Sequence, residues 1–215
     1  ASAEIIVGDG PQIREHESFQ VGCVNTTLAH FPGGLVTAGR FERAVLAASA
    51  EFEEARKRFS SHRRDAAYGC AGTIKAIGRM GAAAGLTDGC VTPAVLAYVR
   101  DRILEGRVPG RFCIPGLRDN RREVLAGGLA VLTAAFETLG LDSMQPVASG
   151  LRTGVLYGLL ERKLERDVRD ETVAGIVKRT GIDKQQASRV AGFAGGVYQL
   201  LQGGRPDSRA RERLR

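Results

Sequence analysis

The chain has 215 residues, of which 43% are hydrophobic and 26% are charged, which is ordinary for a globular protein. Its 31 Lys and Arg residues exceed its 24 Asp and Glu residues by 7, an excess that favours a polyanionic substrate or partner. No apolar run is long enough to cross a membrane and no signal peptide precedes the first expected strand. We therefore expect a cytoplasmic protein with reduced cysteines and no membrane partner.

The first elements form a hairpin followed by a short helix. Ala1–Val7 predicts a strand, Asp9-Gly10 a tight turn, and Ile13–Val21 the returning strand. A helix is expected from about Asn25 until Phe31-Pro32-Gly33-Gly34 ends it. Because the chain opens inside a strand, we expect it to be a fragment of a longer protein.

The next segment predicts an amphipathic helix with one buried face. Its apolar residues recur at helical spacing, with charged residues between them. These expected core residues are Phe41, Val45, Ala48, Phe52, Ala55 and Phe59.

The stretch 65–77 predicts a strand, a glycine turn and the start of a helix near Thr73. Gly69 and Gly72 would let the backbone approach a ligand, and the free N–H groups of a first helical turn attract anions. Thr73 could cap the helix or bind a phosphate, and Lys75 adds a cation. Taken alone, the pattern fits a tight connection without a ligand equally well.

Further helices follow this turn. Thr92-Pro93 predicts a capped helix that ends near Gly106, and Arg107–Arg122 is a basic, loop-rich segment. Val124–Leu139 predicts a long helix buried on most sides. It contains Gly127-Gly128, and Gly inside a helix costs about 1 kcal/mol relative to Ala, so this pair is expected to permit close packing or ligand approach.

The last part of the chain changes from mixed to purely helical. Met144–Ala148 predicts a short strand and Val155–Leu164 a helix, which completes an α/β domain over residues 1–165. Residues 166–202 predict a small all-helical segment, and residues 203–215 a basic tail that we expect to be mobile.

One helix of that segment is predicted in more detail. Asp183 is expected to cap it after Gly181 ends the helix before it. The apolar residues expected to face inward are Ala187, Val190, Ala194, Val197 and Leu201.

Six stretches, taken together, match one family in order and spacing. They are Ser2-Ala3-Glu4, Gly22-Cys23-Val24, Phe31-Pro32-Gly33-Gly34, Gly69–Lys75, Gly127–Ala130 and Leu151–Tyr157. This set resembles the exopolyphosphatase / guanosine pentaphosphate phosphohydrolase (Ppx/GppA) family, which shares the two-lobed, ribonuclease H-like fold of actin, sugar kinases and Hsp70. The resemblance implies that this chain is the second lobe plus the start of a helical domain, and that a first lobe precedes Ala1.

The resemblance also implies a chemistry. A magnesium-assisted water would remove the terminal phosphate of inorganic polyphosphate, or alternatively of guanosine pentaphosphate. Glu4 would orient the water or bind magnesium, and Ser2 would contact phosphate; from its position alone, Glu4 would be an exposed strand carboxylate. The phosphate-binding turn would comprise Gly69, Cys70, Ala71, Gly72 and Thr73.

Lys75 and Arg152 are further candidates for substrate contact, although surface salt bridges would explain both. The family usually has G-A-S-G-T at 69–73, so a hydroxyl is missing here, and two carboxylates are missing at 147–154. We expect a homodimer of the full-length protein, and an inactive fragment when the first lobe is absent.

A different class of function is a polyanion- or DNA-binding module. Residues 172–192 resemble a helix-turn-helix, with a central glycine and a polar second helix. Against this hypothesis, Val177 occupies a crowded position where such motifs prefer alanine. We therefore expect nucleic acid not to be the partner.

Overall fold

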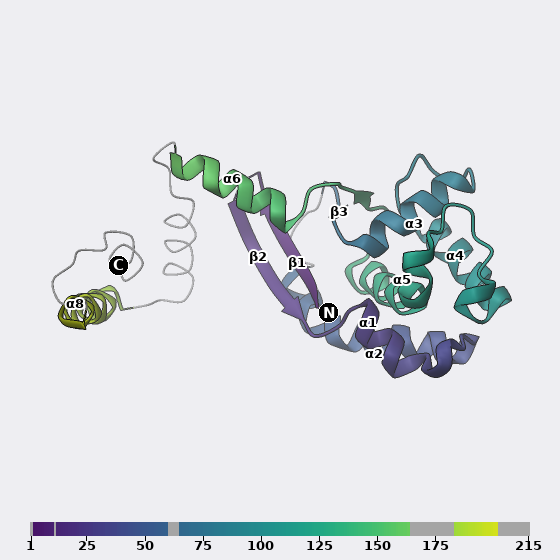
Figure 1. The fold of residues 1–215 in the computed structure, drawn as a ribbon, viewed down its shortest axis with the longest axis horizontal. Coiled ribbons are helices and arrows are strands. Elements are labelled where there is room, and N and C mark those ends of the chain that lie inside the picture. The colour runs from purple at the N-terminus through teal and green to yellow at the C-terminus, as the bar shows by residue number, and fades with distance from the viewer. Residues whose placement is uncertain (1, 11, 60–64, 164–182, 202–215) are drawn as a thin grey trace. The chain divides into compact units, whose positions relative to one another are not determined.

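The computed structural model describes residues 2–10, 12–59, 65–163 and 183–201 (Figure 1). The chain divides into two compact units, residues 1–150 and 151–215, which are described separately. The first unit contains both strands and helices, as the sequence predicts, but they do not alternate strictly and helix predominates. The boundary predicted at residue 165 lies just outside the described residues and stays a prediction.

The first unit begins with an antiparallel hairpin of β1 (Ala3–Asp9) and β2 (Gln12–Phe19). The predicted turn is confirmed, and Gly10 has the positive φ of 55° that such turns favour. One face of the hairpin packs inward, where the rings of Phe19 and Phe52 meet edge-to-face at 5.1 Å. This contact fixes the hairpin on α2 (Ala38–Phe59).

Helix α5 (Asp119–Leu139) is the centre of the first unit. Its surroundings are α1 (Cys23–His30), α2, α3 (Gly72–Ala83) and α4 (Pro93–Gly106), all of which contact it (Figure 1). Leu129 and Ala130 are fully buried, which confirms that this helix is covered on most sides. The predicted core phenylalanines Phe41, Phe52 and Phe59 are each at most 3% exposed.

The sequence placed the start of α5 five residues too late, at Val124. The helix begins at Asp119, so part of the expected loop is helical. The carboxylate of Asp119 interacts favourably with the positive end of the helix dipole. It also forms an ion pair with Arg122, one turn later, at 2.8 Å. Because this polar first turn has no hydrophobic periodicity, the sequence pattern did not indicate that it is helical.

Strands β3 (Tyr68–Gly69) and β4 (Gln145–Pro146) pair in parallel. The backbone N–H of Val147 donates to the carbonyl of Gly69 at 2.9 Å. Met144, just before β4, also bridges to Val91 in the antiparallel sense. These short pairings join the start of α3 to the start of α4 and to the end of the first unit. Two 3₁₀ turns, η1 (Pro32–Gly34) and η2 (Pro109–Arg111), complete this unit.

The described elements of the second unit are α6 (Leu151–Lys163) and α8 (Lys184–Leu201). Helix α6 begins four residues before the expected start. Asp183 caps α8 as predicted, since its Oδ1 accepts from the N–H groups of Gln185 and Gln186 at 2.8 and 3.1 Å.

The inward-facing prediction for α8 is wrong in part. Val190 is 56% exposed and Val197 39% exposed, because no described element covers this face of the helix. Residues 172–182 of the helix-turn-helix-like stretch lie outside the described residues. Among the described helices, none is long and apolar enough to cross a membrane.

Candidate functional site

The glycine turn leaves the carboxyl end of β3, beside the segment that leaves β4. Because β3 and β4 run parallel, the residues after Gly69 and after Pro146 emerge at the same edge. Lys75 joins these two segments, since its Nζ donates to the carbonyl of Ala148 at 3.0 Å. The carboxyl ends of parallel strands are a common place for ligands in α/β folds. The predicted turn therefore lies where a ligand site is expected.

The turn is packed too tightly for side chains. A Cβ atom added to Gly69 would lie 2.6 Å from both Ile74 Cδ1 and Met144 Sδ. One added to Gly72 would lie 2.6 Å from Nη2 of Arg121, so this guanidinium covers the backbone at the start of α3. Both glycines are needed for close packing, and the second one brings a cation against the turn.

Two helices begin at this place without a side-chain cap. Helix α1 follows Gly22 and helix α3 follows Ala71, and neither residue accepts a hydrogen bond with a side chain. Both first turns pack on α5, where a Cβ atom on Gly128 would lie 2.7 Å from Thr73 Oγ1 and 3.1 Å from Cys23 Cβ. The uncapped N–H groups of two helices therefore lie near each other, which favours an anion.

Three arginines near the turn were not identified from the sequence. They are Arg79 on α3, Arg118 at the N-cap of α5, and Arg121 in its first turn. Burial lowers the pKa of Arg79, and the nearby charges of Arg118 and Arg121 lower it further. Their segment was recognised as basic, but only the tertiary fold brings it against the glycine turn.

The other predicted site residues lie on β1. Ser2 and Glu4 are both exposed, and the hydroxyl of Ser2 donates to Oε1 of Glu4 at 2.6 Å. No hydrogen bond or ion pair among the described residues joins Glu4 to the turn at 69–73, so its shared role with the turn stays a prediction. Arg152 is exposed in the first turn of α6, in the second unit.

The turn's own residues differ in what they present. Cys70 and Ala71 are exposed, whereas Thr73 is half-buried against α5. Cys70 is a free thiol. With no hydroxyl at position 71, the chemistry of this turn depends on backbone N–H groups and on neighbouring cations.

Glu4 is the carboxylate available for a divalent cation in the predicted site. No described residue donates a hydrogen bond to its Oε2, and the side chain is exposed. Magnesium is often held by one or two carboxylates together with waters and substrate phosphates, so Glu4 fits as a single protein ligand. Elsewhere in the described part of the chain, no three His, Cys, Asp or Glu side chains gather into a cation site.

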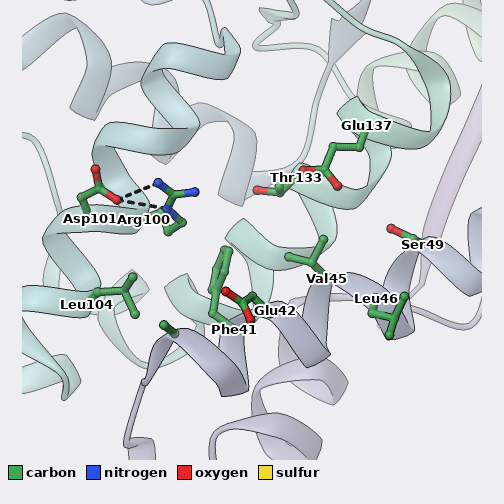
Figure 2. Close-up of a pocket in the computed structure, with 11 residues that line it drawn as sticks. Phe41, Glu42, Val45, Leu46, Ser49, Arg100, Asp101, Leu104, Thr133 and Glu137 are labelled. Atoms are coloured by element: carbon green, nitrogen blue, oxygen red, sulfur yellow. Dashed lines mark hydrogen bonds and ion pairs between the residues drawn. The ribbon is translucent and has the colours of Figure 1, made fainter.

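A separate hollow of about 580 Å³ lies between α2, α4 and α5 (Figure 2). Its charged lining residues are Glu42, Asp101, Glu137 and Arg100. The guanidinium of Arg100 is already bound to Asp101 at 2.9 Å. The negative charge of this lining repels phosphoryl groups, so this hollow does not suit the polyanion that the net charge favours.

The comparisons with known proteins agree with one another. Residues 1–163 match the model of the Ppx/GppA phosphatase family. The chain is 31% identical over 202 residues to the guanosine-5'-triphosphate,3'-diphosphate pyrophosphatase of Aeromonas hydrophila subsp. hydrophila, which aligns 94% of this chain with 40% of that protein.

Two solved structures are similar in fold. The Aquifex aeolicus PPX-GPPA enzyme has 22% identity and a TM-score of 0.59, over 72% of this chain and 52% of that one. An exopolyphosphatase from Cytophaga hutchinsonii has 15% identity and a TM-score of 0.63, over 74% of this chain and 54% of that one. The chain thus spans 40% of the Aeromonas protein and about half of each solved chain.

Proposed function

The chain belongs to the Ppx/GppA phosphatase family, and from that premise we propose that the full-length protein hydrolyses the terminal phosphoanhydride of a chain of phosphoryl groups. One observation carries the proposal: the guanidinium of Arg121 lies over Gly72, at the start of a helix that has no side-chain cap. Among the described residues, no carboxylate pairs with Arg121. A cation and free N–H groups together suit a phosphoryl oxygen.

The proposed reaction is an in-line displacement by water. The water oxygen forms a bond to the terminal phosphorus while the bond from that phosphorus to the bridging oxygen breaks. Orthophosphate leaves, and the remaining chain is one phosphoryl group shorter. Glu4 orients the water and accepts its proton, and Ser2 holds Glu4 in position through the hydrogen bond of 2.6 Å.

The turn and its neighbouring cations stabilise the negative charge that the terminal phosphoryl group carries in the transition state. The backbone N–H groups at 72–74 face the bound oxygens, while Lys75 and Arg121 supply positive charge. The side chain of Thr73 instead packs against Gly128 of α5. In the alternative role of Glu4, its carboxylate would instead hold a magnesium ion that neutralises charge on the phosphoryl oxygens. The exposed Arg152 is a further substrate contact in this proposal.

Two substrates of the same chemistry are in question. The sequence resemblance covers both inorganic polyphosphate, which we expected first, and guanosine pentaphosphate, and the Aeromonas relative is named for the guanosine compound. Comparing kcat/KM for the two substrates with the full-length protein identifies the preferred one.

The first lobe, which lies outside this chain, completes the proposed cleft. Since this chain aligns with 40% of the Aeromonas protein, we propose that the rest of the full-length protein supplies the opposite wall. The isolated chain is then expected to bind phosphoryl chains and release almost no phosphate. Rapid phosphate release by residues 1–215 alone would contradict this division of the site. The homodimer expected from the resemblance also stays a prediction for the full-length protein.

The decisive test is Glu4→Gln in the full-length protein. The amide is isosteric but cannot accept the proton, so we expect kcat to fall by about 10²-fold or more, the usual contribution of a general base. The dissociation constant for substrate should change little, because phosphoryl oxygens are held by the turn. Glu51→Gln, at an exposed carboxylate on α2, removes the same charge and should leave kcat unchanged. Normal turnover in Glu4→Gln would exclude Glu4 from the reaction.

A further inference from the structure

The charges of Arg118 and Arg121 lie close enough to act on Arg79, so these three arginines form a cluster of positive charge. None of the three side chains makes an ion pair or a hydrogen bond within the described part of the chain. The Nε atom of Arg79 is buried without a hydrogen-bond partner. Buried polar atoms are nearly always paired, so an unpaired one requires an explanation.

The cluster continues from the glycine turn along one side of α3. Gly72 and Arg79 are seven residues apart, which places them on the same face of the helix and about 10 Å apart along its axis. Arg121 reaches the Gly72 end. The loop before α5 is fixed at the other end, because a Cβ atom on Gly116 would lie 2.8 Å from the carbonyl oxygen of Arg79.

The neighbouring Arg122 has a structural role in the same segment, and its hydrogen bonds can be compared with those of the three clustered arginines. Its Nε donates to Asp119 at 2.8 Å and its Nη1 to the carbonyl of Phe112 at 2.6 Å. Its charge and its donors are therefore satisfied by the protein. Arg79, Arg118 and Arg121 instead repel one another, and this repulsion lowers the pKa of Arg79 in addition to the effect of burial. A bound polyanion would remove that repulsion.

We propose that Arg79 and Arg118, beside Arg121, form a second phosphoryl subsite that holds the part of the phosphoryl chain behind its terminal group. The ligand is a run of consecutive phosphoryl groups, from an inorganic polyphosphate or from a nucleoside polyphosphate. This inference rests on the proposed function, because the terminal group is assigned to the glycine turn. With this subsite, the affinity of the protein for a ligand rises with the number of phosphoryl groups. Orthophosphate can contact only the glycine turn, whereas a longer chain also contacts the arginines.

The test measures equilibrium binding by calorimetry to the full-length protein, with divalent cations removed so that nothing is turned over. The probes are orthophosphate, inorganic triphosphate and guanosine 5'-triphosphate. In the double variant Arg79→Gln/Arg118→Gln, affinity for at least one triphosphate should fall tenfold or more, and affinity for orthophosphate less than twofold. The probe that loses more affinity identifies the source of the chain.

The matched control removes two charges from exposed ion pairs on α4. Arg100 pairs with Asp101 and Arg102 with Glu105, so Arg100→Gln/Arg102→Gln makes the same change in net charge. An equal loss of triphosphate binding in this control would overturn the proposal, and so would unchanged binding of both triphosphates in the test variant. An equal loss for orthophosphate would also overturn it, because the arginines would then belong to the turn.

Thermal unfolding supplies a second measurement that does not depend on turnover. Without ligand, the test variant should have a Tm no lower than the wild type, because the mutual repulsion has been removed. Inorganic triphosphate should raise the Tm of the wild type more than that of the variant. The single variant Arg118→Gln, at an exposed residue, should show at least half of the loss in the triphosphate-induced rise of Tm. If triphosphate raised the Tm of the wild type and of the double variant equally, the proposal would be overturned. If no substrate is hydrolysed but triphosphate binding follows these expectations, the proposed function fails and the subsite stands.

Discussion

Helices α3 and α4 pack against each other in the first unit, and their first turns are built in opposite ways. At α4, Thr92 Oγ1 accepts from the N–H of Val95 at 3.4 Å, and Pro93 removes one N–H altogether. At α3, Ala71 offers no side-chain acceptor and Gly72 adds no side chain. At the start of α4, residues of the helix itself satisfy or remove the free N–H groups. At the start of α3, the N–H groups have no side-chain acceptor.

The surroundings of the two starts differ in the same sense. Arg121 lies against the open start of α3, and Lys75 in its first turn reaches the loop after β4. The capped start of α4 packs into the apolar core, where Val91 and Val95 are fully buried. Positive charge therefore collects where the N–H groups are free. This difference distinguishes the proposed ligand site from an ordinary helix start more sharply than the glycine content of the turn does.

Of the changes at the two helix starts, closing the open start of α3 with Gly72→Val has the largest expected effect. Its side chain would displace the guanidinium of Arg121 and cover the N–H groups of the first turn. We expect kcat/KM of the full-length protein for its phosphoanhydride substrate to fall by about 10²-fold, the scale of losing a transition-state donor. The measurement is phosphate release at several substrate concentrations. Activity within twofold of the wild type would remove the turn from the site.

A smaller effect is expected from Arg121→Gln, which leaves the helix start open and removes its cation. We expect kcat/KM to fall about tenfold, the usual cost of losing one charge-assisted hydrogen bond. Arg122→Gln is the matched neighbour, and its loss should lower the Tm because it ties α5 to the loop at Phe112. Arg121→Gln should leave the Tm nearly unchanged, and Arg122→Gln should leave kcat/KM nearly unchanged. If both variants lowered activity equally, the contrast between the two arginines would be wrong.

The sequence predicted the local parts of this picture well. The strand, turn and helix around Gly69, the Thr92 cap and the Asp183 cap depend on residues close in sequence, and the structure confirms them. The buried phenylalanines of α2 followed from helical periodicity. These features need no knowledge of long-range contacts.

The parts that were missed depend on tertiary packing. The contact of Arg121 with Gly72 joins segments 49 residues apart, and no local pattern indicates it. The polar start of α5 at Asp119 lacked an apolar stripe. The exposed face of α8 depends on which elements cover it, which the periodicity of the helix alone does not determine.

The smallest expected effect, at the closed start of α4, is one of stability. Thr92→Ala removes the side-chain acceptor for the N–H of Val95, and a lost N-cap typically costs about 1 kcal/mol. Because Thr92 satisfies its own helix, the free energy of unfolding in urea should fall by this amount, while kcat/KM for the phosphoanhydride substrate stays within twofold.

The complementary change, Ala71→Ser, adds a possible cap to α3. It should stabilise the protein if that start merely lacks a cap, and should weaken triphosphate binding by competing for the same N–H groups. A gain in stability without any loss of binding would show that the two helix starts differ only in their caps.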